Sequence, residues 1–223
     1  MPHPDLITLT EPRSPVSEAY RTLRTSLEFS GLDRPLHSLL VTSPAADDGK
    51  AAVLANLAVV MAEGGRRVIL VEGDLRKPAL HDLFGLNNET GLSSLIQGEA
   101  MPQELPLQDS GIDGIKLLTS GPLPPNPSVL LGSDRMKAVI ETLTGQADLV
   151  LLSAPPVIAV TDAALLAAQV DGTLLIVRAG GTERAHVQRA KTLLEKVNAN
   201  LVGAVLTNAT RDGVLKDYYK ERS

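Results

Sequence analysis

The stretch that most constrains the fold is a strand-loop-helix sequence over residues 39–58. An apolar run gives way to a short loop that ends in Gly-Lys, and Lys50 opens a segment rich in Ala, Leu and Val. This is the layout of a phosphate-binding loop, where unpaired N–H groups at a helix N-terminus, the helix dipole and a lysine together attract an anion. The sequence therefore predicts a P-loop whose nucleotide-binding residues are Asp48, Gly49, Lys50, Ala51 and Ala52.

This loop differs from a complete P-loop motif in its side chains. A complete motif has a glycine six residues before the lysine and a Ser or Thr directly after it, whereas this chain has Pro44 and Ala51. Ala51 lacks the hydroxyl that would bind Mg²⁺, and Asp47 and Asp48 place carboxylates where an anion is expected. An ordinary strand-to-helix turn also carries Gly-Lys, so the loop alone leaves both interpretations open.

Apolar runs and helical patterns alternate along the rest of the chain, which predicts an α/β fold: a P-loop NTPase-like, doubly wound, mostly parallel sheet with helices on both faces. Strands are expected at residues 37–43, 67–71, 115–118, 148–153, 172–177 and 201–206. Helices are expected at residues 16–29, 50–63, 129–143, 183–197 and, capped by Thr161-Asp162, up to Gln169. We expect residues 1–14 to be a flexible lead-in, 15–209 one domain and 210–223 a mobile tail with Tyr218 and Tyr219.

Composition excludes several classes of function. A net charge of −5 argues against a nucleic-acid partner, which normally requires a basic surface. The absence of cysteine excludes disulfides, thiolate metal sites and a cysteine nucleophile. The N-terminus has no secretory signal pattern, and the longest nearly apolar run, residues 51–62, is too short to span a bilayer. We therefore expect a cytoplasmic chain.

Two further groups of charged residues are candidate functional features. Glu72, Asp74 and Arg76 follow a buried strand, and open α/β sheets bind ligands at the carboxyl ends of their strands. A plain polar loop is the alternative. On the helix at 16–29, Glu18, Arg21 and Arg24 are spaced by three residues and share one stripe. That stripe predicts either a solvated face with local ion pairs or a contact between subunits.

In their order and in their residues, these segments resemble those of the bacterial tyrosine kinases (BY-kinases). These kinases are cytoplasmic P-loop domains associated with capsule and exopolysaccharide synthesis and export. The resemblance covers about residues 14–209. The matching stretches are residues 18–24, 42–44, 49–50, 56–58, 74–78, 91–93, 121–127, 130–131, 155–156 and 162–163, with His81, Phe84 and Ser133.

The resemblance implies a set of roles for particular residues. The helix with Glu18, Arg21 and Arg24 would pack against a neighbouring subunit of a ring, or against an active kinase relative. One subunit would phosphorylate the tail tyrosines of the next, here Tyr218 and Tyr219. A transmembrane polysaccharide co-polymerase, fused or separate, would activate the kinase, so membrane association is implied through that partner. The implied catalytic residues are Lys50, Glu72, Asp74 and Arg76, with ATP or ADP as ligand.

The chain departs from this family at the residues that hold Mg²⁺. Ala51 replaces the Ser or Thr after the P-loop lysine, and Ser153 replaces an Asp before the x-Pro-Pro sequence. The family's Asp-x-Asp-x-Arg motif begins here with Glu72, which leaves Glu72 and Asp74 as a weak metal site. Phosphoryl transfer depends on positioning and on metal charge, so these losses should compound. The sequence predicts a degenerate kinase that acts as an oligomerising regulator and binds nucleotide weakly.

Two alternatives remain open at this point. An active ATP-dependent protein-tyrosine kinase would need a rearranged Mg²⁺ site made by Glu72, Asp74 and Asp48, with Tyr218 and Tyr219 as acceptors. A nucleotide switch of the chromosome-partitioning type would carry a second lysine five residues before the P-loop lysine. The chain has Ala45 there, which disfavours that reading.

Overall fold

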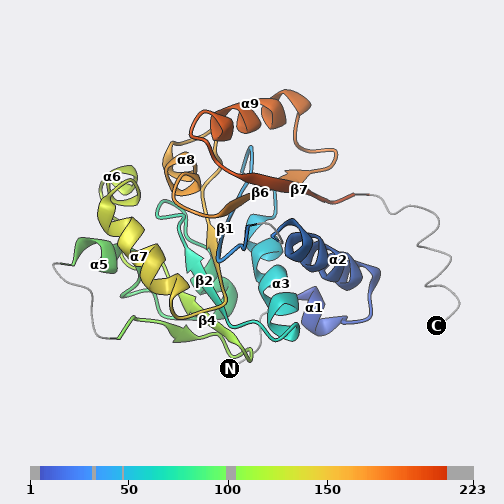
Figure 1. Cartoon of the computed structure of the whole chain (residues 1–223), viewed down its shortest axis with the longest axis horizontal. Helices are drawn as coiled ribbons and strands as arrows, with labels where there is room; N and C mark the ends of the chain where they lie inside the picture. Colours follow the sequence, from blue (N-terminus) through green and yellow to red (C-terminus); the bar gives the residue numbers. More distant parts are fainter. Residues whose placement is uncertain (1–5, 32–33, 47, 99–103, 210–223) are drawn as a thin grey trace, which may run out of the picture.

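A computed structural model describes residues 6–31, 34–46, 48–98 and 104–209, and these residues build one twisted sheet between two layers of helices (Figure 1). Within them the sheet has seven strands in the order β3-β4-β2-β5-β1-β6-β7. The strands are β1 (Ser38–Thr42), β2 (Val68–Glu72), β3 (Gln108–Asp109), β4 (Ile115–Leu118), β5 (Leu149–Ser153), β6 (Gly172–Arg178) and β7 (Leu201–Thr207).

Every strand pairing is parallel except that of β3 with β4. The chain moves from β1 to β2 and on to β3 at the edge of the sheet, returns through β4 to β5, and then crosses β1 to β6 and β7. The order reverses around β1, and ligands of open α/β sheets bind at such a switch point, beyond the carboxyl ends of the strands. The expected doubly wound, mostly parallel fold is confirmed.

The helices divide between the two faces of the sheet. Those on one face share a buried cluster with Leu39, Val41 and Leu70, and those on the other share a cluster with Leu40 and Val71. The first face carries α1 (Ile7–Thr10), α2 (Pro15–Ser30), α3 (Lys50–Glu63) and α4 (Leu80–Phe84). The second carries α5 (Leu92–Gln97), α6 (Pro127–Leu131), α7 (Asp134–Thr144), α8 (Asp162–Ala167) and α9 (Arg184–Glu195).

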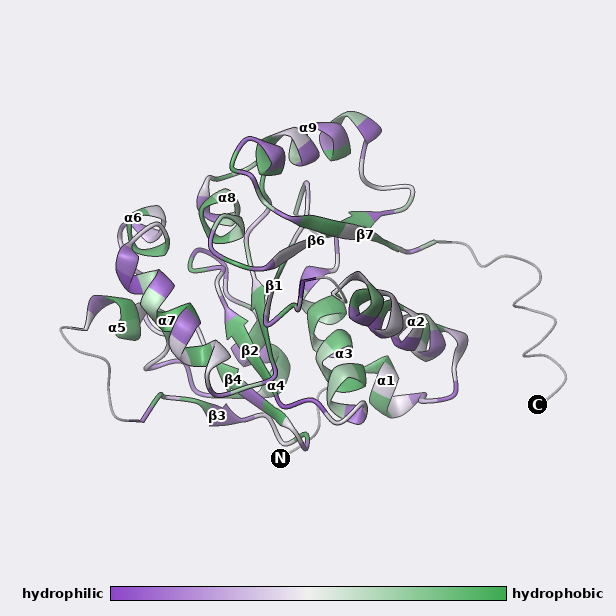
Figure 2. Cartoon of the chain, viewed as in Figure 1, coloured by the Kyte–Doolittle hydropathy of each residue, from purple (hydrophilic) through white to green (hydrophobic). Residues whose placement is uncertain are grey.

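Helix α3 is apolar around nearly its whole circumference, as Figure 2 shows, and residues 53–61 are all buried. A helix that is hydrophobic all round belongs inside a protein, and here α2 covers the side that faces away from the sheet. Helices α7 and α9 are instead polar on their outer faces (Figure 2), with Leu143 and Leu194 on the buried sides. The P-loop helix is therefore a core element of the domain.

The helix expected over residues 129–143 is wrong, because two helices occupy this stretch. Helix α6 ends at Leu131, and α7 begins at Asp134. Gly132 ends the first helix, and Ser133 starts the second by accepting a hydrogen bond from the Met136 N–H at 3.2 Å. Ser is a strong N-cap, so it begins a new helix here although the apolar pattern continues across it.

The flexible lead-in expected for residues 1–14 does not hold for residues 6–14, which the structure describes. Leu6 is buried, and the short helix α1 packs against α2 and α3. The N–H and hydroxyl of Thr8 both donate to Asn56 Oδ1, at 3.0 and 2.8 Å. A four-residue helix is too short for periodicity to reveal, and its position depends on a buried Asn 48 residues away.

Candidate functional site

The phosphate-binding loop connects β1 to α3 at the carboxyl edge of the sheet. Gly49 is the N-cap of α3, with a left-handed φ of 82° that glycine adopts without strain. The first helical hydrogen bond runs from the Val53 N–H to the Gly49 carbonyl at 3.0 Å. Lys50 and Ala51 are half-buried and Ala52 is exposed, so this turn opens toward solvent. Among the described residues, no carboxylate lies within salt-bridge distance of Lys50.

Asp48 is buried, and its hydrogen bonds hold the phosphate-binding loop in place. Its Oδ1 accepts a hydrogen bond from the Thr182 hydroxyl at 2.7 Å, and its Oδ2 accepts from the Ala45 N–H at 3.3 Å. The Thr207 hydroxyl donates to the Asp48 carbonyl at 3.1 Å. Asp48 therefore joins the loop to the β6–α9 connection and to the end of β7, two contacts that the sequence did not reveal. Asp47 lies outside the described residues.

Glu72 is 2% exposed and is the most completely bonded carboxylate of the predicted site. One oxygen accepts from the Ser153 hydroxyl and from the Asp74 N–H at 3.1 Å. The other accepts from the N–H groups of Ala79 and Leu80 at 2.8 and 2.9 Å, at the start of α4. Burial raises the pKa of this carboxyl, although these four donors act in the opposite direction. Glu72 thus fixes the loop between β2 and α4.

Asp74 is also buried and makes a tight local turn. Its Oδ1 accepts from the backbone N–H groups of Arg76 and Lys77, at 3.2 and 3.0 Å. Side chains of Asp that bond the backbone two or three residues later stabilise turns of this kind. The structure therefore brings Glu72 and Asp74 together at the end of β2, where both oxygens of Glu72 and one oxygen of Asp74 accept from the loop backbone.

Arg76 makes a bidentate ion pair that the sequence did not predict. Its Nε and Nη2 donate to the two oxygens of Asp162 at 2.8 and 3.0 Å. Asp162 is fully buried, while the Arg76 side chain is 39% exposed. Hydrogen bonds to Asp162, followed by its charge and that of Asp74, raise the pKa of Arg76. Asp162 belongs to a stretch that matches the bacterial tyrosine kinases, and this match was the signal in the sequence that could have marked it as a site residue.

The helix expected after Thr161 does begin there, with Thr161 in the N-cap position, but its end and its capping differ from the prediction. Helix α8 ends at Ala167, and Thr161 makes no side-chain capping hydrogen bond. The Asp162 carboxylate is turned to Arg76, across the carboxyl edge of the sheet. The pair thus ties the loop after β2 to the start of α8.

These residues do not fit the Mg²⁺ site that the resemblance implies. Mg²⁺ requires oxygen ligands in near-octahedral geometry, usually one or two carboxylates with water and phosphate oxygens. Ala51 has no side-chain oxygen, Ser153 donates its hydroxyl to Glu72, and the Glu72 oxygens already accept four hydrogen bonds. Of the two predicted metal ligands, only Asp74 keeps an oxygen, Oδ2, that accepts no hydrogen bond from the described residues. Over the part of the chain that the structure describes, no group of three His, Asp or Glu side chains is arranged to hold a metal.

The motif on α2 contacts the P-loop helix of its own chain. Helix α2 starts as expected, with Ser14 as N-cap and Pro15 in the first position. Arg21 bonds Glu18 and lies 3.4 Å from a Glu63 oxygen at the end of α3. Arg24 donates to the Val60 carbonyl at 2.8 Å. The local ion pairs are therefore present, whereas the subunit contact stays a prediction.

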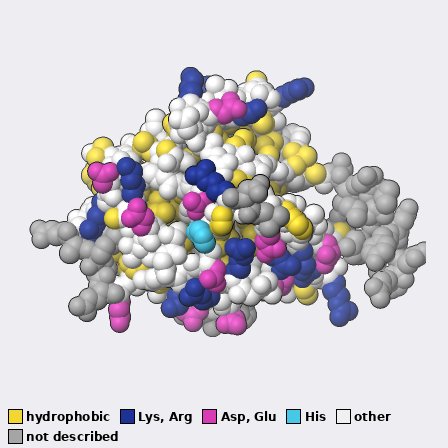
Figure 3. Space-filling model, in the orientation of Figure 1, with side chains coloured by type: hydrophobic (Ala, Val, Ile, Leu, Met, Phe, Trp, Pro, Cys, Tyr) yellow, Lys and Arg dark blue, Asp and Glu magenta, His cyan; other side chains and the backbone are white. Residues whose placement is uncertain are grey.

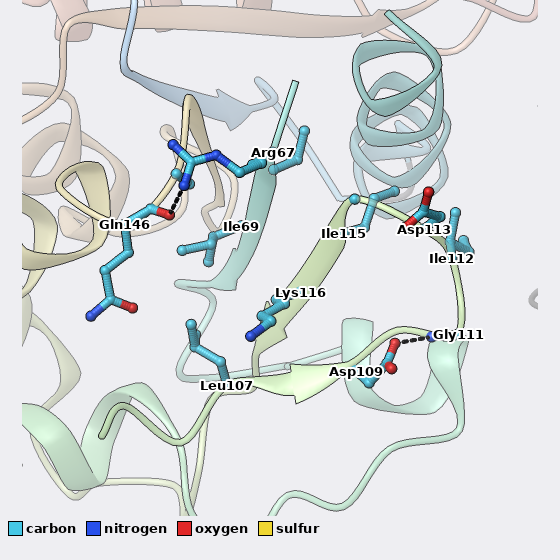
Figure 4. Close-up of a pocket in the computed structure, with 13 residues that line it drawn as sticks. Arg67, Ile69, Leu107, Asp109, Gly111, Ile112, Asp113, Ile115, Lys116 and Gln146 are labelled. Carbon is cyan, nitrogen blue, oxygen red and sulfur yellow. Dashed lines mark hydrogen bonds between the residues drawn. The ribbon is translucent and has the colours of Figure 1, made fainter. Parts of the chain in front are cut away.

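A pocket of about 500 Å³ lies away from these residues, at the amino ends of β2 and β4 (Figure 4). Ile69, Leu107 and Lys116 line it, together with Gln146, whose carbonyl accepts from Arg67. It shares no residue with the predicted site, so the carboxyl edge remains the candidate site.

Three remaining expectations concern the surface and the tail. Tyr218 and Tyr219, the predicted phosphoacceptors, lie outside the described residues. On the face in Figure 3, Lys and Arg side chains are interspersed with Asp and Glu, rather than gathered into one basic field. Among the described helices, none combines the length and the hydropathy that crossing a membrane requires.

Comparison with known proteins connects this chain to a family. The ParA family model, described as "NUBPL iron-transfer P-loop NTPase", matches residues 36–211. The chain is 41% identical over 203 residues to the tyrosine-protein kinase YwqD of Bacillus subtilis, covering 91% of this chain and 85% of YwqD.

Two solved structures are similar over most of their length. The chimerical protein CapA2B2 matches with a TM-score of 0.87 and 36% identity, over 92% of this chain and 90% of that one. The kinase domain of the Escherichia coli tyrosine kinase ETK matches with a TM-score of 0.89 and 33% identity, over 96% and 83%.

Proposed function

The chain belongs to the bacterial tyrosine-kinase family of ParA-like P-loop NTPases, and from this premise we propose that it is a degenerate member with little or no kinase activity. Its role is that of an oligomerising regulator in exopolysaccharide or capsule synthesis and export. Nucleotide binding, as ATP or ADP, is retained in weakened form.

This proposal rests on the difference between the phosphate-binding part and the metal-binding part of the site. Gly49 and Lys50 lie at the start of α3, where free N–H groups and the lysine would receive phosphates. Asp74 is left as the one predicted metal ligand with an uncommitted oxygen, because Ala51 has no side-chain oxygen and Glu72 bonds Ser153 and α4. Phosphoryl transfer needs metal charge at the β- and γ-phosphates, so binding is expected to outlast catalysis.

The regulatory part of the proposal rests on α2 and on the relatives. Glu18, Arg21 and Arg24 are all present, and Glu18 is exposed on the outer side of α2. Self-association or entry into rings of an active relative is the expected use of this helix. A transmembrane polysaccharide co-polymerase is the proposed partner, which places a cytoplasmic chain at the membrane. Similarity to the chimerical protein CapA2B2 supports the search for a fused or separate partner.

The test is a phosphotyrosine assay combined with a measurement of mass in solution. The purified protein is incubated with ATP and Mg²⁺ and probed for phosphotyrosine, with YwqD as the positive control. We expect no signal from this chain, together with masses above that of one chain by light scattering. Phosphotyrosine that disappears in Lys50→Met would refute the loss of activity, and a monomer that binds no co-polymerase would refute the regulatory role.

The second candidate is an active tyrosine autokinase, which the 41% identity to YwqD favours. In this reading Tyr218 and Tyr219 of one subunit would be phosphorylated by the next. Removing both tyrosines by Tyr218→Phe and Tyr219→Phe would then abolish the phosphotyrosine signal. The partitioning-type switch remains disfavoured because Ala45 stands where a second lysine is needed.

A further inference from the structure

We propose that Glu72 and Ser153 form one interdependent pair that replaces a metal site, so that this P-loop binds the phosphates of a nucleotide without a divalent cation. The inference rests on the proposed function, since it assumes that nucleotide binding survives. It assigns Glu72 a positioning role in place of the catalytic and metal-binding roles predicted from sequence.

The pair is formed by neighbouring strands in register. Glu72 and Ser153 are opposite each other at the carboxyl ends of β2 and β5. The Ser153 hydroxyl donates to Glu72 Oε1 and accepts from the Gly73 N–H at 3.2 Å. The hydroxyl thus uses its proton and one of its two lone pairs within the pair, and Ser153 is only 5% exposed, so little of it is accessible to a ligand.

The second oxygen of Glu72 fixes the loop that follows β2. It accepts from the N–H groups of Ala79 and Leu80, two of the donors that have no partner within a helix at the start of α4. An Asp at position 72 is one methylene shorter and would draw its carboxylate back from these donors. The length of Glu72 is therefore what allows one carboxylate to reach both Ser153 and α4.

The backbone around the pair leaves little freedom to rearrange. A Cβ atom added to Gly73 would lie 2.4 Å from the Ser153 carbonyl oxygen, so the two strand ends are in close contact. An Asp at position 153 would place a second carboxylate beside Glu72 and remove the hydroxyl donor, and like charges in a buried site repel strongly. The residue at each position thus depends on the residue at the other.

With Glu72 and Ser153 committed in this way, the groups that face a bound anion are cationic or neutral donors. They are the Lys50 ammonium and the N–H groups of the first turn of α3, which attract an anion without a metal. A nucleoside diphosphate carries the charge that these donors recognise. The divalent cation would gain no protein side chain from positions 51, 72 or 153.

The first experiment is calorimetric titration of the full chain with ADP, in buffer with EDTA and in buffer with Mg²⁺. We expect one dissociation constant in both buffers, to within about twofold. In the triple variant Ala51→Ser, Glu72→Asp, Ser153→Asp, Mg²⁺ should tighten ADP binding by about tenfold or more, which corresponds to about 1.4 kcal/mol. Mg²⁺-dependent binding by the unaltered chain, no ADP binding in either buffer, or a folded triple variant that ignores Mg²⁺ would each overturn the inference.

If the triple variant does not fold, two single variants test whether Glu72 is a positioning residue or a metal ligand. Glu72→Gln and Ser153→Ala should lower the melting temperature equally with and without Mg²⁺ and leave the effect of Mg²⁺ on ADP binding absent. Glu141→Gln, an exposed carboxylate on α7, is the matched control and should change neither quantity. If Glu72→Gln instead weakened ADP binding only in the presence of Mg²⁺, Glu72 would be a metal ligand. Phosphotyrosine and mass measurements test the proposed function separately from these titrations.

Discussion

The ion pair between Arg76 and Asp162 should be one of the side-chain contacts that most stabilises the carboxyl edge of the sheet. Asp162 is fully buried, and both of its oxygens accept from the Arg76 guanidinium. The substitution Arg76→Ala leaves this carboxylate buried with neither of these donors. We expect a clear loss of stability, because a buried charge without its partner is costly.

The size of the loss follows from the exposure of the two side chains. Breaking a fully buried pair costs about 3–5 kcal/mol. The Arg76 side chain is 39% exposed, so water can replace part of the lost interaction. We therefore expect about 2 kcal/mol, and a chain of this length changes its melting temperature by about 2–4 °C for each kcal/mol, which gives about 4–8 °C.

Thermal unfolding followed by circular dichroism, with urea titration as a second measure, tests this reasoning. The double variant Arg76→Ala, Asp162→Asn should be more stable than Arg76→Ala alone, since it also removes the buried charge. Lys137→Ala, which breaks an exposed ion pair with Asp134, is the control and should have little effect. An Arg76→Ala variant with the melting temperature of the unaltered protein would contradict this expectation. So would a double variant that is less stable than Arg76→Ala.

Three further predictions concern other parts of the fold. Hydrogen bonds from Arg67 lower the pKa of Asp148 from 3.8 to about 2. The contribution of Asp148 to stability is therefore present above pH 3.8 and is lost as the pH falls through 2. Melting curves of Asp148→Asn and of the unaltered protein should converge at about pH 2. Gly91→Ala should fail to fold, since its Cβ would lie 2.2 Å from a backbone oxygen, whereas Gly31→Ala meets only ordinary contacts; soluble yield and circular dichroism compare them. Ser133→Ala should cost about 1 kcal/mol in urea unfolding by removing the N-cap of α7, and an unchanged midpoint would contradict that role.

Sequence patterns predicted the parts of the fold that local physics determines. The apolar runs gave the central strands, Ser14 and Pro15 gave the start of α2, and the Gly-Lys pair gave the start of α3. They failed where a short-range signal competed with a longer pattern, as at Ser133. They also failed at α1, where the deciding contact is with Asn56 in another helix.

The candidate site was predictable in its location but not in its chemistry. The alternation of strands and helices predicts a parallel sheet, and Glu72, Asp74 and Arg76 do lie at its carboxyl edge, whereas the strand order that puts the switch point at β1 comes from the structure. The direction of each side chain depends on strand register and on loops distant in sequence. Only the pairing of β2 with β5 shows that Glu72 meets Ser153.

The position of β1 at the centre of the sheet has a consequence for how the chain folds during synthesis. Ser38 pairs with Val150, and Leu39 pairs with Gly172, so both neighbours of β1 are made long after it. The roughly 130 residues between β1 and β6 take on the order of 10 s to translate at about 5–20 residues per second. Throughout that time the apolar α3 lacks the completed sheet on which it packs. The phosphate loop is thus among the first segments made and among the last to be fixed in place, and α3 is an apolar segment that can aggregate until β6 has emerged.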